Sequence, residues 1–230
     1  MAVRRRRKFM KGHGSKGNSG DERLLSRDEW GEAQDIQGSS ELILNSPIIN
    51  KAQERILDQF TPKHPIAFVS PCTSTRPYTK SWKWKIFKKE LTGVDFIVSS
   101  NAGIIPLEYE DSYPYLTYDA RHDPMFDDLY LIYTMRSLIR FFTLKHYEYV
   151  VFNFRPSPHV MRRRKAGVVA GRYLKEHHHI QDYAVCPSKP VLKNALKAIS
   201  GRKGFYDRMY PDVHPLVLDD MKDIIEKFKQ

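Results

Sequence analysis

Residues 66 to 87 read IAFVSPCTSTRPYTKSWKWKIF. The stretch begins with a short apolar run that is typical of a buried strand, and it ends in a pattern that is typical of a helix. Between the two lies a polar loop that contains Cys72, Arg76 and several hydroxyl side chains. In open α/β sheets, ligands bind where such loops leave the carboxyl ends of the strands. The stretch therefore predicts a strand, a binding loop and a helix, in that order.

Apolar runs continue to alternate with helical patterns along the rest of the chain. Further strands are expected at residues 94–98, 149–154 and 182–186, and helices near residues 48–60, 80–91, 125–147, 158–176, 189–200 and 214–228. This alternation predicts an α/β fold, a three-layer sandwich in which helices flank a largely parallel central sheet of about four strands. Right-handed crossovers would bring the loops after residues 70, 99, 154 and 186 to one edge of that sheet.

The chain is expected to contain three regions. Residues 1–20 hold a basic run and little that could be buried, which predicts a disordered basic tail. Residues 21–61 are expected to form a helical lead-in, because their apolar positions reach helical spacing before Pro62. Residues 62–230 are expected to form the α/β core domain with a C-terminal helix.

The apolar segments favour a protein of the cytoplasm over a membrane or secreted protein. The longest of them, residues 125–144, is interrupted by Arg136 and Arg140, so it indicates a buried helix rather than a membrane span. The basic N-terminal run is not followed by the apolar core of a secretory signal. Only two cysteines are present, Cys72 and Cys186, which is typical of a reducing compartment.

The charge of the chain favours a polyanionic partner. The net charge is +11, from 38 basic and 27 acidic residues. Residues 155–175 contain seven basic residues and no acidic one, which favours a surface that follows phosphates over a merely solvated helix face. The candidate RNA-binding residues are Arg4, Arg5, Arg6, Arg7, Arg162, Arg163, Arg164 and Lys165.

The first stretch also resembles a known signature. Pro71, Cys72, Pro77, Tyr78, Ser81 and Phe87 match the core-domain pattern of archaeosine synthase, P-C-S-x-x-K-P-Y-S-x-S-x-S-H-x-x-F. Thr73, Arg76 and Thr79 replace Ser, Lys and Ser of that pattern, and Lys83 and Trp84 occupy the place of its Ser-His pair. Gly103 to Glu108, Tyr113-Pro114 and Tyr118-Asp119 are similar to the family's G-x-x-P-x-E, Y-P and Y-D elements. The resemblance covers roughly residues 62 to 200, and archaeal tRNA-guanine transglycosylases carry a related domain.

The resemblance implies a transferase, or a subunit of one, that attaches lysine to the nitrile of a 7-deazaguanine base in archaeal tRNA. The expected partners are tRNA and a partner subunit that supplies further RNA-binding or catalytic domains. No membrane, metal or cofactor is expected, because no spaced set of metal ligands stands out. Two alternatives remain open: a non-catalytic tRNA-binding subunit of the same fold, and a glycosylase or nuclease that acts on nucleic acid.

Candidate site residues follow from the two loops and from the resemblance. The candidate catalytic residues are Cys72, Thr73, Ser81, Glu108 and Asp119, and the candidate substrate-binding residues are Ser74, Arg76, Tyr78, Asn101 and Gly103. Cys72 is either a thiol nucleophile activated by nearby cations or a small buried residue. The hydroxyls that follow it either hold an anion or cap the next helix. Seven acids between residues 105 and 128 either recognise a cationic substrate or form a solvated loop.

Overall fold

The computed structural model describes residues 37–39, 45–112, 114–116, 119–121, 127–155, 161–200 and 211–230. Its middle layer is a sheet of five strands in the order β4-β3-β2-β6-β7. Their bounds are β2 Ile66–Pro71, β3 Asp95–Ser100, β4 Gly103–Pro106, β6 Tyr149–Asn153 and β7 Asp182–Cys186. β2 runs parallel to both β3 and β6, and β6 runs parallel to β7. The predicted α/β fold with a largely parallel sheet is confirmed.

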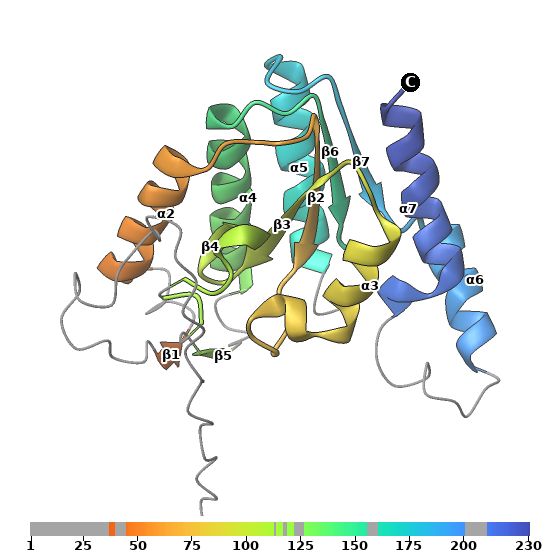
Figure 1. The fold of residues 1–230 in the computed structure, drawn as a ribbon, viewed down its shortest axis with the longest axis horizontal. Coiled ribbons are helices and arrows are strands. Elements are labelled where there is room, and N and C mark those ends of the chain that lie inside the picture. The colour runs from red at the N-terminus through yellow and green to blue at the C-terminus, as the bar shows by residue number, and fades with distance from the viewer. Residues whose placement is uncertain are drawn as a thin grey trace, which may run out of the picture.

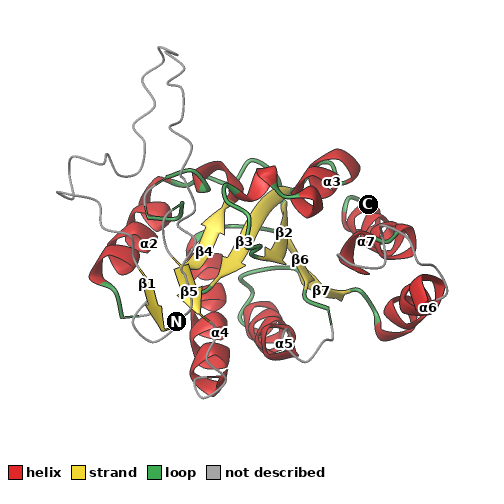
Figure 2. Ribbon diagram, turned by 90° about the horizontal axis from the view of Figure 1, so that it is seen from below, coloured by secondary structure: helices red, strands yellow, loops and turns green. Residues whose placement is uncertain are grey.

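Helices cover both faces of this sheet (Figure 2). α3 (Trp82–Glu90) and α7 (Pro215–Phe228) lie on one face, with α6 (Lys189–Ser200) packed beside α7. α4 (Asp127–Leu144) and α5 (Met161–Glu176) pack against each other on the opposite face. Every residue of the central strand β2 is buried, as expected of a parallel strand that is covered on both faces.

The strand β4 is the one element of this sheet that the sequence did not predict. It pairs antiparallel with β3, so that Pro106 lies opposite Ile97 and Gly103 lies opposite Ser100. Gly103 has a φ of +103°, a conformation that favours glycine and allows the chain to turn back sharply after β3. The hairpin reverses the chain direction, and this reversal decides where the following acidic segment lies.

The helix α5 approaches the sheet closely. A Cβ atom built on Gly167 would come within 2.8 Å of the ring of Phe154, and one built on Gly171 would overlap the ring of Tyr183. Glycine at these positions lets the helix backbone lie against the aromatic side chains of β6 and β7. This close packing fixes the N-terminal turns of α5, which carry Arg163 and Arg164, at the end of the sheet.

The lead-in before the sheet contains both a helix and a strand. Pro47–Gln59 forms α2, which begins at the cap Ser46 and lies beside β4, as the helical spacing predicts. The prediction of a helical lead-in is wrong at Gln37–Ser39, which form the short strand β1 and pair in parallel with β5 (Asp119–Arg121). The predicted disordered tail, residues 1–20, lies outside the described residues. No helix in the described ranges is long and apolar enough to cross a membrane.

Candidate functional site

The carboxyl ends of the parallel strands meet at one edge of the sheet. In Figure 1 the arrows of β2, β6 and β7 all point toward that edge. The loop after β2 is tied to the end of β3, because the backbone N–H of Cys72 donates to the carbonyl of Ser99 at 3.0 Å. Asn101 directly follows β3, and Arg155 follows β6 by two residues. The predicted gathering of these loops at one edge is confirmed.

Arg163 contacts two of these loops. Its Nη2 atom donates to Oδ1 of Asn101 at 2.8 Å, and both terminal nitrogens lie 3.9 Å from the sulfur of Cys72. All three side chains are half-buried. The helix α5 therefore places a guanidinium group directly beside the thiol and the carboxamide that end β2 and β3.

Lys83 and Arg155 meet a carboxylate at the same edge. The Nζ atom of Lys83, whose side chain is 3% exposed, donates to the carbonyl of Pro71 at 3.0 Å. It also lies 3.9 Å from Oδ2 of Asp212, while the Nε atom of Arg155 lies 3.8 Å from Oδ1 of the same residue. Asp212 belongs to the short 3₁₀ helix η6 (Pro211–Val213) that precedes α7. Elements from both helical layers thus converge over the end of the sheet.

We call Cys72, Lys83, Asn101, Arg155, Arg163 and Asp212 the edge cluster. Burial is the largest influence on Lys83 and lowers the pKa of its ammonium group to about 8. Asp212 and Cys72 oppose this effect, and the positive charges of Arg155 and Arg163 reinforce it. Lys83 can therefore exchange a proton close to neutral pH, which an ordinary exposed lysine does not do.

The second cysteine has a different environment. Cys186 is fully buried at the end of β7, and its thiol donates to the carbonyl of Phe152 at 3.6 Å. Burial raises the pKa of the Cys186 thiol, with a smaller contribution in the same direction from Asp220. Cys186 is thus an inert packing residue, and Cys72 is the thiol that can react.

Polar side chains near the ends of β2, β3 and β6 line the base of this edge. Nδ2 of Asn153 donates to Oγ of Ser70 at 3.2 Å. Oδ1 of Asn153 and Oγ of Ser99 are buried, and no hydrogen-bond partner for them exists among the described residues. Such groups are rare in folded proteins, and their presence is typical of sites that bind a ligand or water.

Most of the predicted loop residues have structural contacts. Oγ of Ser81 caps α3 by accepting from the N–H of Trp84 at 3.4 Å, and Oγ1 of Thr73 donates to the carbonyl of Thr75 at 3.1 Å. Tyr78 is fully buried in the core, and the guanidinium carbon of Arg76 lies 5.9 Å from the centre of its ring. Two roles were expected for these hydroxyl groups, anion binding and helix capping, and Ser81 has the capping role.

Three other predicted residues occupy different positions. Ser74 is exposed on the loop after β2. Gly103 begins β4 and lies against the side chain of Gln53 from α2. Asp119 begins β5, where it pairs with Gln37 rather than with any strand of the main sheet.

Glu108 lies at the opposite end of β3 from the edge cluster. Because β4 is antiparallel to β3, it carries the chain back toward Asp95, the first residue of β3. A six-residue strand spans about 20 Å, so Glu108 and Asn101 are separated by about that length. Glu108 forms an ion pair with Lys63 instead. The structure therefore does not bring Glu108 together with Cys72, Thr73 and Asn101.

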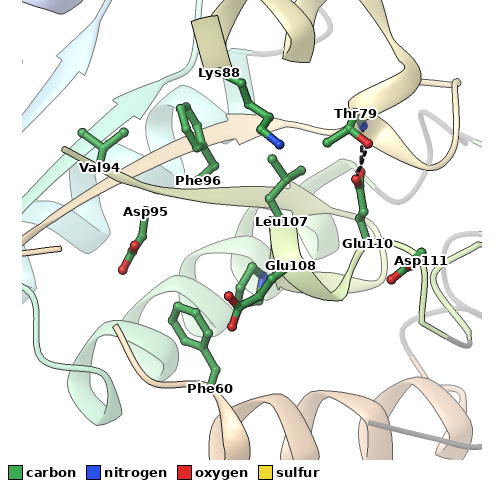
Figure 3. Close-up of a pocket in the computed structure, with 11 residues that line it drawn as sticks. Phe60, Thr79, Lys88, Val94, Asp95, Phe96, Leu107, Glu108, Glu110 and Asp111 are labelled. Atoms are coloured by element: carbon green, nitrogen blue, oxygen red, sulfur yellow. Dashed lines mark hydrogen bonds between the residues drawn. The ribbon is translucent and has the colours of Figure 1, made fainter. Parts of the chain in front are cut away.

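A cleft of about 360 Å³ opens at that opposite end, between α3 and the β3–β4 hairpin (Figure 3). Three of its four acidic side chains, Asp95, Glu108 and Glu110, are already engaged within the protein. Glu110 accepts from the backbone N–H of Thr79 at 2.7 Å and also from its hydroxyl. Asp95 accepts from the hydroxyl of Tyr147 at 3.0 Å and from the N–H of Lys63 at 2.8 Å. The carboxylates of this cleft thus mainly bind neighbouring residues of the protein itself.

The predicted RNA-binding residues of α5 also separate into different roles. Arg164 donates to the backbone carbonyls that end β6 and β7, at distances from 2.8 to 3.5 Å for Phe154, Val185, Cys186 and Pro187. Lys165 is exposed. The side chain of Arg162 and the whole of Arg4, Arg5, Arg6 and Arg7 lie outside the described residues. Arg164 is therefore occupied by the fold, and Arg163 by the edge cluster.

Three members of the edge cluster, Lys83, Arg155 and Asp212, were not predicted as site residues. Arg155 follows the strand β6, and its place on a loop at the expected edge was a usable signal. Asp212 lies far away in the sequence, in a short segment without any motif. Lys83 was noticed only as a departure from the archaeosine synthase pattern. In the described part of the chain, no three His, Cys, Asp or Glu side chains gather in a way that could hold a metal ion.

Comparison with known proteins places the chain in a family without an assigned activity. No curated protein matches the sequence. The crystal structure of AF0587, a protein of unknown function, is similar with a TM-score of 0.49 and 15% sequence identity. The match covers 76% of this chain and 49% of AF0587, so the chain spans about half the length of that protein. Residues 49–186 match the family model described as Domain of unknown function (DUF5591), and since they are more than half of the chain, the protein belongs to that family.

Proposed function

We propose that this protein is a transferase, or the catalytic subunit of one, that modifies a nitrile-bearing 7-deazaguanine base in tRNA. The observation that supports this proposal best is the convergence of Cys72, Lys83 and Arg163 at the carboxyl edge of the sheet. The segment that resembles archaeosine synthase ends β2 at this same edge and supplies both Cys72 and Lys83. The substrate class comes from that resemblance, and the reacting groups come from the geometry.

Cys72 is the nucleophile in this proposal. A thiolate needs cations beside it, and Arg163 lies 3.9 Å from the sulfur. A nitrile carbon accepts a thiolate readily and forms a covalent adduct, which divides one difficult transfer into two easier steps. In the first step the sulfur bonds to the nitrile carbon, one π bond of the nitrile breaks, and the nitrile nitrogen becomes basic.

Lys83 provides the proton in this first step. The nitrile nitrogen takes a proton from its ammonium group, whose pKa of about 8 suits exchange near neutral pH. The amine of the second substrate then adds to the same carbon, and the carbon–sulfur bond breaks to return the thiolate. The proton lost by the amine returns to Lys83. The product is an amidine that keeps every atom of the nitrile and of the amine, and no oxidant or reductant is needed.

The base must leave its stack to reach this edge, as it does in other enzymes that act on nucleobases. Asn101, Asn153 and Ser99 offer carboxamide and hydroxyl groups beside Cys72, and two of these groups are buried without a partner in the described part of the chain. A purine-like base presents neighbouring donors and acceptors on its edge that suit such groups. These polar groups are therefore suited to recognise an extruded nucleobase.

A second candidate function is a non-catalytic tRNA-binding subunit of the same fold. The observation that favours it is the position of Trp84, which stands where the archaeosine synthase pattern has His. Trp84 is fully buried, and its ring packs edge-on against Phe87 with centroids 5.8 Å apart. A core tryptophan cannot act as a base, so this candidate predicts tight binding of tRNA without turnover.

Mass spectrometry of tRNA nucleosides tests the proposed function in cells. A strain that lacks this protein should accumulate the nitrile-bearing base, and a plasmid copy of the wild-type gene should restore the modified base. Restoration should fail with Cys72→Ser and succeed with Lys85→Gln, which changes an exposed cation of α3. Normal modification in the deletion strain would contradict both candidate functions. Full restoration by Cys72→Ser would favour the binding subunit.

A further inference from the structure

The edge cluster holds more positive than negative charge. Lys83, Arg155 and Arg163 come together there, and the carboxylate that contacts them among the described residues is Asp212. Oδ2 of Asp212 lies 3.9 Å from Nζ of Lys83 and Oδ1 lies 3.8 Å from Nε of Arg155, and Oδ1 has no hydrogen-bond partner among the described residues. Arg163 faces the thiol of Cys72 and the neutral carboxamide of Asn101, and no acidic side chain is hydrogen-bonded to it in the described residues.

Asp220 of α7 is used elsewhere, because it accepts from the N–H of Ser188 at 3.3 Å. A half-buried arrangement of like charges is unfavourable unless an anion completes it. The unpartnered Oγ of Ser99 and the carboxamide of Asn101 lie at the carboxyl end of β3 and can complete the coordination of an oxyanion.

We infer that Arg163 and Arg155, with Lys83 beside them, form an oxyanion-binding site that holds an anionic group of the substrate next to Cys72. The inference rests on the proposed function for the source of that anion. One source is the carboxylate of an amino acid that donates the amine, and the other is a phosphate that flanks the modified base. Arginine suits both, because its fork of donors matches the geometry of carboxylate and phosphate oxygens.

Calorimetric titration of the full chain with paired small ligands distinguishes these sources. L-lysine and cadaverine differ only in the carboxylate, and guanosine 5′-monophosphate and guanosine differ only in the phosphate. Binding of lysine but not cadaverine assigns the site to a carboxylate. Binding of the nucleotide but not the nucleoside assigns it to a phosphate, and inorganic phosphate should then compete.

Matched variants test whether the edge cluster is responsible. Arg163→Gln and Arg155→Gln should each weaken binding of the anionic ligand by roughly ten- to a hundredfold, as expected for the loss of one charged hydrogen-bonding partner. Lys85→Gln removes one positive charge from an exposed position of α3 and should leave the affinity unchanged. Far-ultraviolet circular dichroism checks that each variant is folded.

Two results would overturn the inference. Either no anionic ligand binds to the wild type at millimolar concentration, or Lys85→Gln weakens binding as much as Arg163→Gln does. The first result would mean that the cluster needs no external anion. Neither result would touch the proposed function, because transfer to tRNA is measured separately. Anion binding without any transfer would contradict the proposed function but would still support the anion-binding site.

Discussion

The ammonium nitrogen of Lys83 lies 3.9 Å from a carboxylate oxygen of Asp212, and the two side chains are only 3% and 9% exposed. Burial of such a pair costs desolvation energy that the mutual attraction does not reliably return. Well-packed apolar residues at the two positions would serve the fold at least as well. An expensive charged pair at the carboxyl edge of a parallel sheet is therefore typical of a working site.

Replacement of Lys83 by Met should remove one component of the pH dependence of stability. The pKa of Lys83 is about 8 in the folded protein and 10.5 ordinarily, so between these values the unfolded chain binds more protons. Wild-type stability should therefore rise through this window, by up to about 3 kcal/mol, relative to Lys83→Met. Thermal melts from pH 7 to 10.5 measure the difference. Lys85→Met, at an exposed position of α3, is the control, and parallel curves for wild type and Lys83→Met would refute the account.

Alkylation should distinguish the two thiols. Cys72 is half-buried beside Arg163, whereas Cys186 is fully buried and its pKa is raised. Iodoacetamide should modify Cys72 in the folded protein and Cys186 only after unfolding, as peptide mass spectrometry can follow. Arg163→Gln should slow the modification of Cys72 several-fold, since it removes the positive charge that lies 3.9 Å from the sulfur. Equal rates at the two cysteines would contradict the described geometry.

Arg164→Lys should destabilise the protein although it keeps the charge. One ammonium group cannot replace a guanidinium that donates to four carbonyls at the ends of β6 and β7. The loss of buried hydrogen bonds should cost about 2–3 kcal/mol, which lowers the Tm by roughly 5–10 °C in a chain of this size. Lys165→Gln should change the Tm little. If Arg164→Lys instead melts like the wild type and binds tRNA less well, Arg164 belongs to an RNA surface after all.

Gly103→Ala should also destabilise the fold, because the substitution is strained in two ways. Gly103 has a φ of +103°, and a Cβ atom would overlap the side chain of Gln53. That side chain accepts from the N–H of Ile104 at 2.9 Å and donates to the hydroxyl of Tyr115 at 2.7 Å, so it cannot move without loss. We expect a loss of about 2–4 kcal/mol in a chemical denaturation experiment. An unchanged midpoint would mean that the turn after β3 is not built as described.

The sequence predicted the main sheet and its helices well where the pattern was strong. Runs such as Ile66 to Val69 and Tyr149 to Phe152 are apolar on both faces, which is the pattern of a buried parallel strand. The four-residue strand β4 was missed because its apolar residues, Ile104 and Ile105, form too short a run to be distinguished from a loop. That omission had a consequence, since it left Glu108 assigned to the wrong end of the sheet.

The candidate site was predictable only in part, because some of its residues come together only through tertiary packing. Parallel strands place the loop residues Cys72 and Asn101 at one edge, and the sequence order alone supports that prediction. Asp212 reaches the same edge from more than a hundred residues away, through the packing of η6 against α3, and no local pattern encodes such a contact. Arg163 and Arg164 are adjacent in the sequence, yet one meets the edge cluster and the other the strand ends, because consecutive helical residues point in different directions.

Transfer of an isotope-labelled amine to tRNA is the most direct test of the edge cluster as a reacting centre. Purified protein would be incubated with labelled lysine and tRNA that carries the nitrile-bearing base, with and without candidate partner subunits, and the nucleosides would be weighed by mass spectrometry. We predict labelled product with the wild type and with Lys85→Gln, and rates lower by about a hundredfold or more with Cys72→Ser and Lys83→Met. Transfer by Cys72→Ser at the wild-type rate, or tight tRNA binding by the wild type with no transfer under any of these conditions, would contradict the account.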